Sequence, residues 1–334
     1  MALTVVMYHY VRKLEQSRFP EIKGLEIELF EEQIHYLKKH YQPVRIEALI
    51  DAINEDLLHE LPENALLLTF DDGYLDHFTN VFPLLHRLGL QGAFYIPGRA
   101  VEEGKVLNVN KVHFLLASVP DKEKIIRQIE KELSAYREQY QLESFEHYYQ
   151  KYAQANRFDN KEVIFIKRIL QKGLPEILRN ELTASLFGQF VSADETAFAA
   201  ELYLSKEQIL CMVSCGMHIG SHSYDHYWLN TLNQKAQSEQ VSLSLDFLRS
   251  LGVNIDYWTM CYPYGGWDNN LLHVLRKNGC QLGFAVGVNL ENPSGQSRLT
   301  LPRLDTNDIP KDRNATRSEL GESFRTIKTG IKIY

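Results

Sequence analysis

Residues 66–74 read LLLTFDDGY, an apolar run that ends in two adjacent carboxylates, Asp71 and Asp72, and a glycine. The apolar part predicts a short buried strand, and the Asp-Asp-Gly sequence predicts a sharp turn directly after it. Barrels and open parallel sheets of the α/β class place their active sites at such strand ends. Neighbouring like charges resist sharing a site unless a cation or a proton separates their roles, so this pair suits a metal ligand beside a general base. An ordinary solvated turn is the alternative for the tripeptide taken alone.

Strand-like runs of this kind recur along the chain and alternate with helical patterns. They lie at residues 3–8, 66–70, 92–96, 218–220, 257–261 and 283–286. Helix signals fall between them, for example a capping box formed by Ser205 and Gln208 before a helix that ends at Gly216. The alternation predicts an α/β fold with a parallel sheet.

Residues 98–204 break this rhythm, because they contain successive helical patterns with no convincing strand between them. We predict that this stretch is a helical insertion. Its many tyrosines have two interpretations: they pack the core of a small helical subdomain, or they belong to a lid that contacts the substrate.

The composition excludes several classes of protein. The chain has 334 residues, of which 44% are hydrophobic, and this is enough for a substantial core and argues against disorder. Its 36 Lys and Arg against 43 Asp and Glu give a net charge of −7, so we expect no nucleic-acid partner. No apolar run approaches the roughly 20 residues of a membrane-spanning helix, and no secretion signal is evident. We therefore expect no integral membrane segment and a cytoplasmic location. The sequence does not indicate an oligomeric state.

A second candidate site lies in residues 220–226, GSHSYDH, which again follow a strand-like run. His222 and His226 can bind one metal ion, either across one helical turn or from a tight loop. Two histidines at this spacing are a weak signal alone. Together with Asp72 they give three protein ligands that leave a position open for water, as in catalytic metal sites. We place His218 on the strand itself, as a packing residue or a support for the ligands.

Residues 261–267, CYPYGGW, are the third candidate, a strand end that runs into a turn rich in glycine and aromatic residues. Pro263, Tyr264 and Gly265 could aim a backbone N–H and an aromatic wall at a sugar. Alone, such a sequence is more often an ordinary turn.

These three pieces, in this order, resemble the motifs of the polysaccharide deacetylases, the NodB-homology group (family 4) of the carbohydrate esterases. The first motif matches TFDDG at 69–73, the second matches the two histidines with Ser223 between them, and the third matches YPYG at 262–265 in part. The resemblance implies a distorted (β/α) barrel of seven or eight strands, a divalent metal held by Asp72, His222 and His226, and Asp71 as the base for the nucleophilic water. It divides the chain into a barrel at 1–97 and 205–310, a helical insertion or lid at 98–204, and a C-terminal tail at 311–334.

The chain departs from the family pattern in two places. Cys261 stands where many members carry an arginine that steadies the base, and no Leu-x-x-His near the C-terminus supplies the usual general acid. Two elements resemble those of a subgroup whose site elements are permuted in sequence. MYHYV at 7–11 contains His9 as a candidate acid, and LPRLD at 301–305 contains Arg303, which could reach Asp71. Otherwise His9 caps a strand and Arg303 forms a surface ion pair.

The resemblance implies a metal-dependent hydrolase that removes an N-acetyl group from an amino sugar in a glycan or glycan precursor. Asp71 would act as base, His9 as acid, and a backbone N–H near Tyr264 as a stabiliser of the oxyanion. A site with two histidines, one aspartate and an open position suits Zn²⁺, our first choice, or Co²⁺, Ni²⁺ or Fe²⁺. The alternatives are removal of a formyl group or an O-acetyl ester, or a sugar-binding barrel that has lost catalysis.

Overall fold

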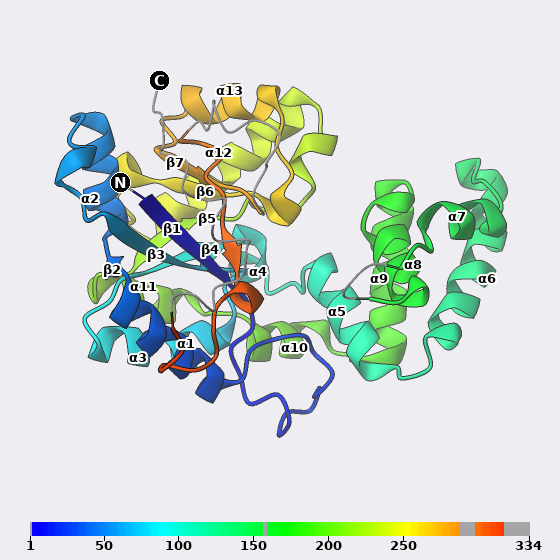
Figure 1. Cartoon of the computed structure of the whole chain (residues 1–334). Helices are drawn as coiled ribbons and strands as arrows, with labels where there is room; N and C mark the ends of the chain where they lie inside the picture. Colours follow the sequence, from blue (N-terminus) through cyan, green and yellow to red (C-terminus); the bar gives the residue numbers. More distant parts are fainter. Residues whose placement is uncertain (1, 156–158, 287–297, 317–334) are drawn as a thin grey trace. The chain divides into compact units, whose positions relative to one another are not determined.

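The computed structural model describes residues 2–155, 159–286 and 298–316, and in them one sheet of eight strands with helices packed around it (Figure 1). The strands are β1 (Ala2–Tyr8), β2 (Gln42–Pro43), β3 (Asn64–Asp71), β4 (Gly92–Ile96), β5 (His218–Ser221), β6 (Thr259–Cys261), β7 (Leu282–Phe284) and β8 (Leu304–Asp305). Their order is β7-β6-β5-β4-β3-β1-β8, with β2 paired to β3, and every pair is parallel. The sheet confirms the predicted distorted (β/α) barrel. Each predicted run overlaps a strand, whereas β2 and β8 were not predicted.

Alternate residues of each strand point to opposite faces of the sheet. On one face, Leu67 of β3 packs in a buried cluster that also contains Leu49 of α2 (Ile46–Asn54). On the other face, Leu68 and Phe94 pack in the larger cluster formed with the surrounding helices. Asp71 follows Leu67 by four residues and therefore lies on the first face, so β3 carries a carboxylate into the barrel interior.

The segment at 298–305 links the two ends of the sheet. Leu301 forms a parallel bridge with β7, and β8 pairs with β1. The approach to β7 requires a glycine: the Gly283 carbonyl accepts a hydrogen bond from the Leu301 N–H at 2.8 Å, and a Cβ on Gly283 would lie 2.1 Å from the carbonyl oxygen of Leu299. The same segment carries Arg303 into the barrel, where its side chain is fully buried.

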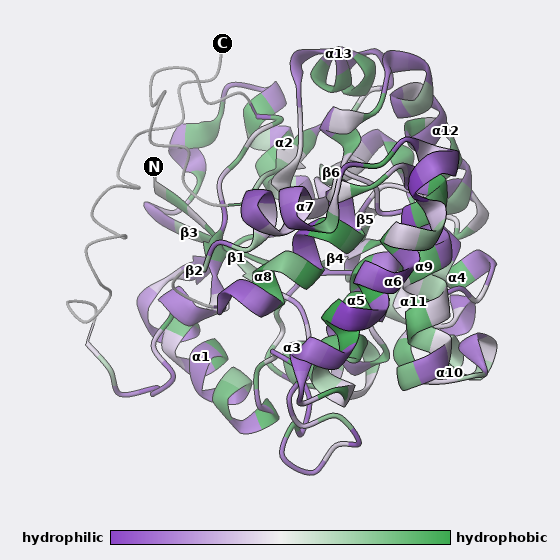
Figure 2. Cartoon of the chain, turned by 90° about the vertical axis from the view of Figure 1, so that its right-hand side faces the viewer, coloured by the Kyte–Doolittle hydropathy of each residue, from purple (hydrophilic) through white to green (hydrophobic). Residues whose placement is uncertain are grey.

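The helices that belong with the barrel are mostly amphipathic, and Figure 2 shows hydrophilic and hydrophobic residues sharing the turns of α13. Besides α2 they are α1 (Ile27–His40), the π-helix η2 (His77–Val81), α3 (Phe82–Arg87), α4 (Gly98–Glu102), α11 (Lys206–Ser214), α12 (Gln234–Ser250) and α13 (Asn269–Lys277). Short 3-10 turns are η1 (Leu58–Glu60), η4 (Leu229–Thr231), η5 (Ile255–Tyr257), η6 (Pro263–Gly265) and η7 (Thr306–Asp308). The predicted capping box of Ser205 and Gln208 begins α11.

A second compact unit consists of Leu14–Lys23 and Lys105–Ala199, and the rest of the described chain forms the first. Its helices are α5 (Asn108–Ser118), α6 (Lys122–Tyr140), α7 (Phe145–Tyr152), α8 (Lys161–Arg168), the π-helix η3 (Ile169–Gly173) and α9 (Glu176–Phe190). The helix α10 (Glu195–Leu202) includes the boundary between the units. The tyrosines of α6 and α7 lie in or against this unit's own apolar core, which favours the interpretation that they pack a helical subdomain.

The observed unit differs from the predicted insertion at 98–204, because Leu14–Lys23 belongs to it and residues 98–104 and 200–204 do not. Leu14–Lys23 joins this unit through tertiary contacts of Phe19. The ring of Phe19 lies 4.9 Å from that of Phe114 and 5.8 Å from that of Phe198. Such contacts between distant residues leave no periodic signal in the sequence.

No helix within the described ranges is both long and apolar enough to cross a membrane. Of the predicted tail at 311–334, the structure describes 311–316, where Arg313 pairs with Glu32 of α1. The remainder of that prediction lies outside the described residues.

We predict that Gly283→Ala destabilises the barrel, because the added Cβ collides with backbone rather than with a flexible side chain. The expected loss is about 1–3 kcal/mol in the free energy of unfolding, measured by chemical denaturation. Gly188→Ala in α9 is the matched control, since its Cβ would meet no atom within 4 Å and alanine is favoured over glycine inside a helix. Equal stability of Gly283→Ala and the wild type would contradict this account of closure.

Candidate metal and acid-base site

The residues singled out from the sequence gather at the C-terminal ends of the parallel strands, or, for Arg303, one residue before β8. Asp71 ends β3, and Asp72 follows it. The others are His9 after β1, His222 and His226 after β5, and Pro263, Tyr264 and Gly265 after β6. Because all the strands run in one direction, these positions meet at one end of the barrel.

Asp72, His222 and His226 form a buried cluster whose ligand atoms all lie within 4.8 Å of one another. Oδ1 of Asp72 lies 3.4 Å from Nε2 of His222 and 3.2 Å from Nε2 of His226. The other carboxylate oxygen, Oδ2, accepts a hydrogen bond of 2.5 Å from the Tyr74 hydroxyl. Oδ1 is buried and receives no hydrogen bond from the described residues. An acceptor in this state, aimed at two imidazole nitrogens, fits a divalent cation.

The two imidazoles are oriented by different means. Nδ1 of His222 donates to the carbonyl oxygen of Cys261 at 2.8 Å, so Nε2 is the nitrogen that faces Oδ1 of Asp72 and that would bind a cation once it is deprotonated. His226 sits in a tight loop rather than a helix, with Ser223 and His226 both at positive φ (55° and 59°). The Ser223 hydroxyl accepts the His226 backbone N–H at 2.9 Å. Of the two arrangements open from the sequence, the structure therefore has the loop.

The turn after β3 separates the two adjacent carboxylates. Asp72 and Gly73 both have left-handed backbone (φ 76° and 66°), and a Cβ on Gly73 would lie 2.9 Å from the side chain of Ile96. Only glycine satisfies both the conformation and the space at this position. The turn directs Asp72 toward the histidines and leaves Asp71 on the strand.

Asp71 forms a buried, bidentate ion pair with Arg303. Nη1 donates to Oδ1 at 2.8 Å, and Nη2 donates to Oδ2 at 2.7 Å. Nη1 also donates to Thr69 Oγ1 at 3.1 Å. Burial alone would raise the pKa of Asp71, but the Arg303 guanidinium and neighbouring imidazoles lower it well below the usual range. The ion pair of Arg303 is therefore buried and not on the surface. Arg303 pairs with Asp71, the carboxylate that an arginine at position 261 would contact in many family members.

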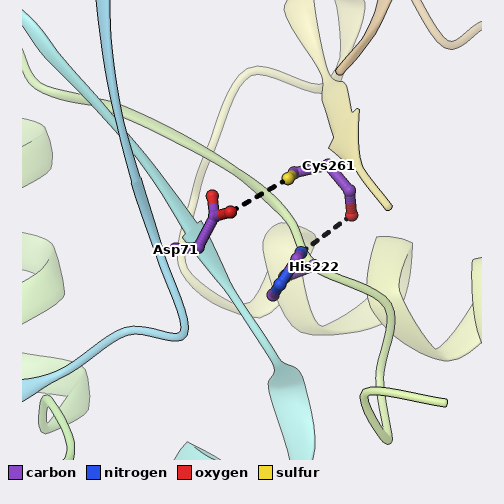
Figure 3. Close-up of side chains that lie close together, drawn as sticks. All are labelled: Asp71, His222 and Cys261. Carbon is purple, nitrogen blue, oxygen red and sulfur yellow. Dashed lines mark hydrogen bonds between the residues drawn. The ribbon is translucent and has the colours of Figure 1, made fainter. Parts of the chain in front are cut away.

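Asp71, His222 and Cys261 also lie close together (Figure 3). The thiol donates weakly to Oδ2 of Asp71 at 3.4 Å, and His222 uses the Cys261 carbonyl rather than the sulfur. Burial raises the pKa of the Cys261 thiol, and a thiol must lose its proton to become a strong metal ligand. Since Arg303 already occupies both oxygens of Asp71, the group containing Asp72 is the better metal site.

Comparison with known proteins identifies the family of the chain. The family model for polysaccharide deacetylases matches residues 59–152 and 158–283, more than half of the chain. The chain belongs to the polysaccharide deacetylase family. YxkH of Bacillus subtilis (strain 168), provisionally named a polysaccharide deacetylase, is 25% identical over 100 residues, which are 30% of this chain and 33% of that protein. The chain thus matches one third of the length of this curated relative.

Several solved structures share the fold. The Streptococcus pyogenes deacetylase PplD in complex with acetate has a TM-score of 0.57 and 15% identity, over 98% of this chain and 99% of that one. IcaB from Ammonifex degensii has a TM-score of 0.54 and 17% identity over 98% and 97%. A de-N-acetylase from Aggregatibacter actinomycetemcomitans has a TM-score of 0.53 and 15% identity over 98% and 100%.

Two further predicted residues line this deacetylase-family site. Nε2 of His9 lies 3.9 Å from Oδ2 of Asp71, and its side chain is 40% exposed. The Tyr264 ring packs edge-on against His226 at 4.9 Å and stacks on Trp228 at 4.5 Å. Tyr264 itself has positive φ (57°). The structure thus brings His9 and Tyr264 to the same strand ends as the metal cluster.

Pro263 and Gly265 lie beside Tyr264 in the short turn η6. Gly265 has φ 69°, and a Cβ there would lie 3.0 Å from Val286. The Gly265 N–H donates to the carbonyl of Tyr262 at 2.9 Å. Gly265 therefore shapes the turn, and its own N–H is engaged within it.

Three supporting residues were missed in the sequence. Tyr74 holds Asp72, Trp228 backs Tyr264, and His77 donates from Nε2 to the His9 carbonyl oxygen at 2.9 Å. Tyr74 directly follows the first motif and could have been suspected. His77 and Trp228 sit among other apolar and aromatic residues and carry no such signal.

We predict that Zn²⁺ stabilises the protein through Asp72, His222 and His226. At a free concentration 100 times Kd, one site adds about 2.7 kcal/mol and raises Tm. The Zn²⁺-induced shift should vanish in His222→Ala and Asp72→Ala and persist in Asp71→Asn, as measured by calorimetry. His273→Ala, at an exposed position of α13, is the control for histidine removal. A full shift in both ligand variants would eliminate this cluster as the metal site.

His77 should make stability depend on pH. Burial lowers its pKa from 6.5 to about 4, so between these values the unfolded chain binds a proton that the folded chain does not. Stability from this group is complete above pH 6.5 and is lost as pH falls toward 4, by about 3 kcal/mol. Urea denaturation without added metal at pH 7 and pH 4 should show a smaller loss for His77→Phe than for the wild type. Identical losses would contradict the buried neutral state.

Proposed function

We propose that this chain is a metal-dependent hydrolase that removes an N-acetyl group from an amino sugar in a glycan or glycan precursor. The observation that carries the proposal is the pairing of two environments at one barrel end. Asp72, His222 and His226 offer a three-ligand cation site, and Asp71 lies beside it, held by Arg303. Family membership and the fold shared with solved deacetylases support the same reaction class.

A divalent cation at Asp72, His222 and His226 would act as a Lewis acid toward the acyl carbonyl and lower the pKa of water toward neutrality. The mixed nitrogen and oxygen donor set suits Zn²⁺, which we propose, and also Co²⁺, Ni²⁺ and Fe²⁺. The Cys261 carbonyl holds Nδ1–H of His222, so Nε2 of this ligand faces Asp72 and the ring is oriented before any cation binds.

Asp71 is the proposed general base. Arg303 keeps this carboxylate ionised and fixes its plane. Among the described residues, Oδ1 accepts a single hydrogen bond, from Arg303, and so retains a second lone pair for an incoming proton. The same ion pair makes Asp71 a weak base, because its pKa lies well below the usual range. Proton transfer to Asp71 is therefore favourable only from a nucleophile that is already acidified.

His9 is the proposed general acid, and the turn at 263–265 the proposed oxyanion and substrate wall. The exposed imidazole of His9 lies next to Asp71. It can therefore give a proton to the departing nitrogen on the same side of the substrate on which Asp71 accepts a proton from the water. Pro263, Tyr264 and Gly265 border His226 through the Tyr264 ring. The backbone N–H of Tyr264 is the proposed oxyanion donor, since Pro263 has none and that of Gly265 donates to Tyr262; such a donor contributes about 3–4 kcal/mol of transition-state stabilisation.

Loss of catalysis in a sugar-binding barrel is the weaker alternative, because base, arginine partner and all three ligands are present together. Removal of formyl groups or O-acetyl esters would use the same residues. The cytoplasmic location stays a prediction, and with it our expectation that the substrate is a precursor rather than assembled wall polymer.

The test is release of small acids from matched N-acetyl, N-formyl and O-acetyl sugars with and without added Zn²⁺. We expect Zn²⁺-dependent acetate release from N-acetylated oligosaccharides. Asp71→Asn should lower kcat by at least about 100-fold while Zn²⁺ still raises its Tm. Asp246→Asn, at an exposed position of α12, is the charge-matched control. Wild-type turnover by Asp71→Asn would remove the base assignment, and release of formate or ester acetate alone would replace the proposed substrate.

A further inference from the structure

Residues 9–12, directly after β1, are fastened to the segment that follows β3. His77 Nε2 donates to the His9 carbonyl oxygen at 2.9 Å, and Asn80 Nδ2 donates to the Val11 carbonyl oxygen at 2.7 Å. Arg12 Nε donates to Asp76 at 2.6 Å. Each contact joins residues more than 60 positions apart in sequence. We call His77 and Asn80 the η2 clamp.

The position of both donors follows from the local helix. His77 begins the π-helix η2 and Asn80 lies within it. Both side-chain N–H donors reach the same stretch of backbone, at the carbonyl oxygens of His9 and Val11. π-helical turns are rare and are frequently found at functional sites.

His77 is built to act as a fixed donor. The partner atom is a carbonyl oxygen, so Nε2 must carry the hydrogen. The ring is buried and packs against Phe70, Tyr74 and Phe94. Burial keeps it neutral near pH 7, because its pKa falls to about 4. The tautomer and the ring position are therefore both determined by the barrel.

The His9 side chain, by contrast, is held by few interactions of the imidazole itself. It is 40% exposed, and its nearest charged neighbour, Asp71, is 3.9 Å away, beyond hydrogen-bonding distance. Among the described residues, the anchor of His9 is its backbone. Tyr10 adds to that anchor by stacking on Tyr74 at 4.0 Å, and Tyr74 in turn donates to the candidate metal ligand Asp72.

We propose that the η2 clamp positions His9 for proton donation, so that His77 and Asn80 are positioning residues of the site. The inference rests on the proposed role of His9 as general acid. It adds that the acid is placed through main-chain hydrogen bonds from η2, and not through a hydrogen bond to the imidazole itself.

The consequence depends on the leaving group. In amide hydrolysis, water adds to the acyl carbon, its proton passes to Asp71, and the C–N bond breaks as Nε2–H of His9 gives its proton to the departing amine. An aryl ester such as 4-nitrophenyl acetate releases a stable phenolate and needs no proton from an acid. Displacement of His9 should therefore slow the amide and spare the ester.

The experiment measures kcat and KM for an N-acetylglucosamine trisaccharide and for 4-nitrophenyl acetate. His77→Phe keeps the ring packing and removes the donor, whereas His77→Gln restores an N–H donor. We expect His77→Phe and Asn80→Ala to lower kcat for the amide at least about tenfold, with KM within about twofold and ester turnover within about threefold. His77→Gln should recover most of the amide rate. Thr79→Ala, exposed on the same turn, is the matched control and should change neither.

His9→Ala separates the two levels of the argument. If it lowers the amide-to-ester ratio and His77→Phe and Asn80→Ala do not, the clamp is wrong and the acid assignment stands. If His9→Ala leaves the ratio unchanged, the acid assignment itself fails. Equal loss of both activities in His77→Phe would mark a structural defect and overturn the positioning role.

A second measurement does not depend on turnover. Hydrogen exchange of the backbone amides at 10–12 should be faster in His77→Phe and Asn80→Ala than in the wild type. Each variant removes the side-chain donor to the His9 or Val11 carbonyl oxygen, so this stretch of backbone opens more readily. Thr79→Ala should leave it unchanged. Unchanged exchange in both clamp variants would show that residues 9–12 do not depend on η2.

Discussion

The buried ion pair between Asp71 and Arg303 joins the fold to the site. Asp71 ends strand β3, and Arg303 arrives on the segment that links β7 to β1. Removing one partner of such a pair leaves an uncompensated buried charge and costs about 3–5 kcal/mol. The carboxylate can remain ionised inside the barrel only while the linking segment is in place. Closure of the sheet and ionisation of the proposed base therefore depend on each other, so a change that disrupts one also disrupts the other.

Two neighbouring carboxylates can then hold different roles without competing. The strand geometry sends Asp71 into the barrel, and the left-handed turn at Asp72 and Gly73 sends the next carboxylate toward His222 and His226. Arg303 neutralises the first. The second has a hydrogen bond on one oxygen and none from the described residues on the other. Its negative charge is free for a cation, and the like-charge repulsion expected from the sequence is relieved by these separate partners.

Much of this was predictable because the information was local. Runs of three to six strand-like residues marked the longer strands, and short motifs marked Asp72, His222 and His226. The two-residue strands β2 and β8 carried too few residues for a pattern and exist through pairing with β3 and β1. The segment at Leu14–Lys23 joins the helical unit through Phe19, a contact that sequence periodicity cannot express. His77 was hidden for the same reason, because its donor role appears only when β1 and β3 lie side by side.

The position of Cys261 shows how the departures from the family pattern fit together. Its sulfur lies 3.4 Å from Asp71 in the barrel interior, where it is fully buried. A guanidinium reaching Asp71 from this position would enter space beside the one that Arg303 already fills, and both would claim the same two oxygens. Two buried cations on one carboxylate leave one of them uncompensated. A small neutral thiol at 261 and an arginine at 303 are therefore complementary. The cysteine in place of arginine in the third motif leaves room for Arg303 to reach Asp71 from the segment at the other end of the sheet.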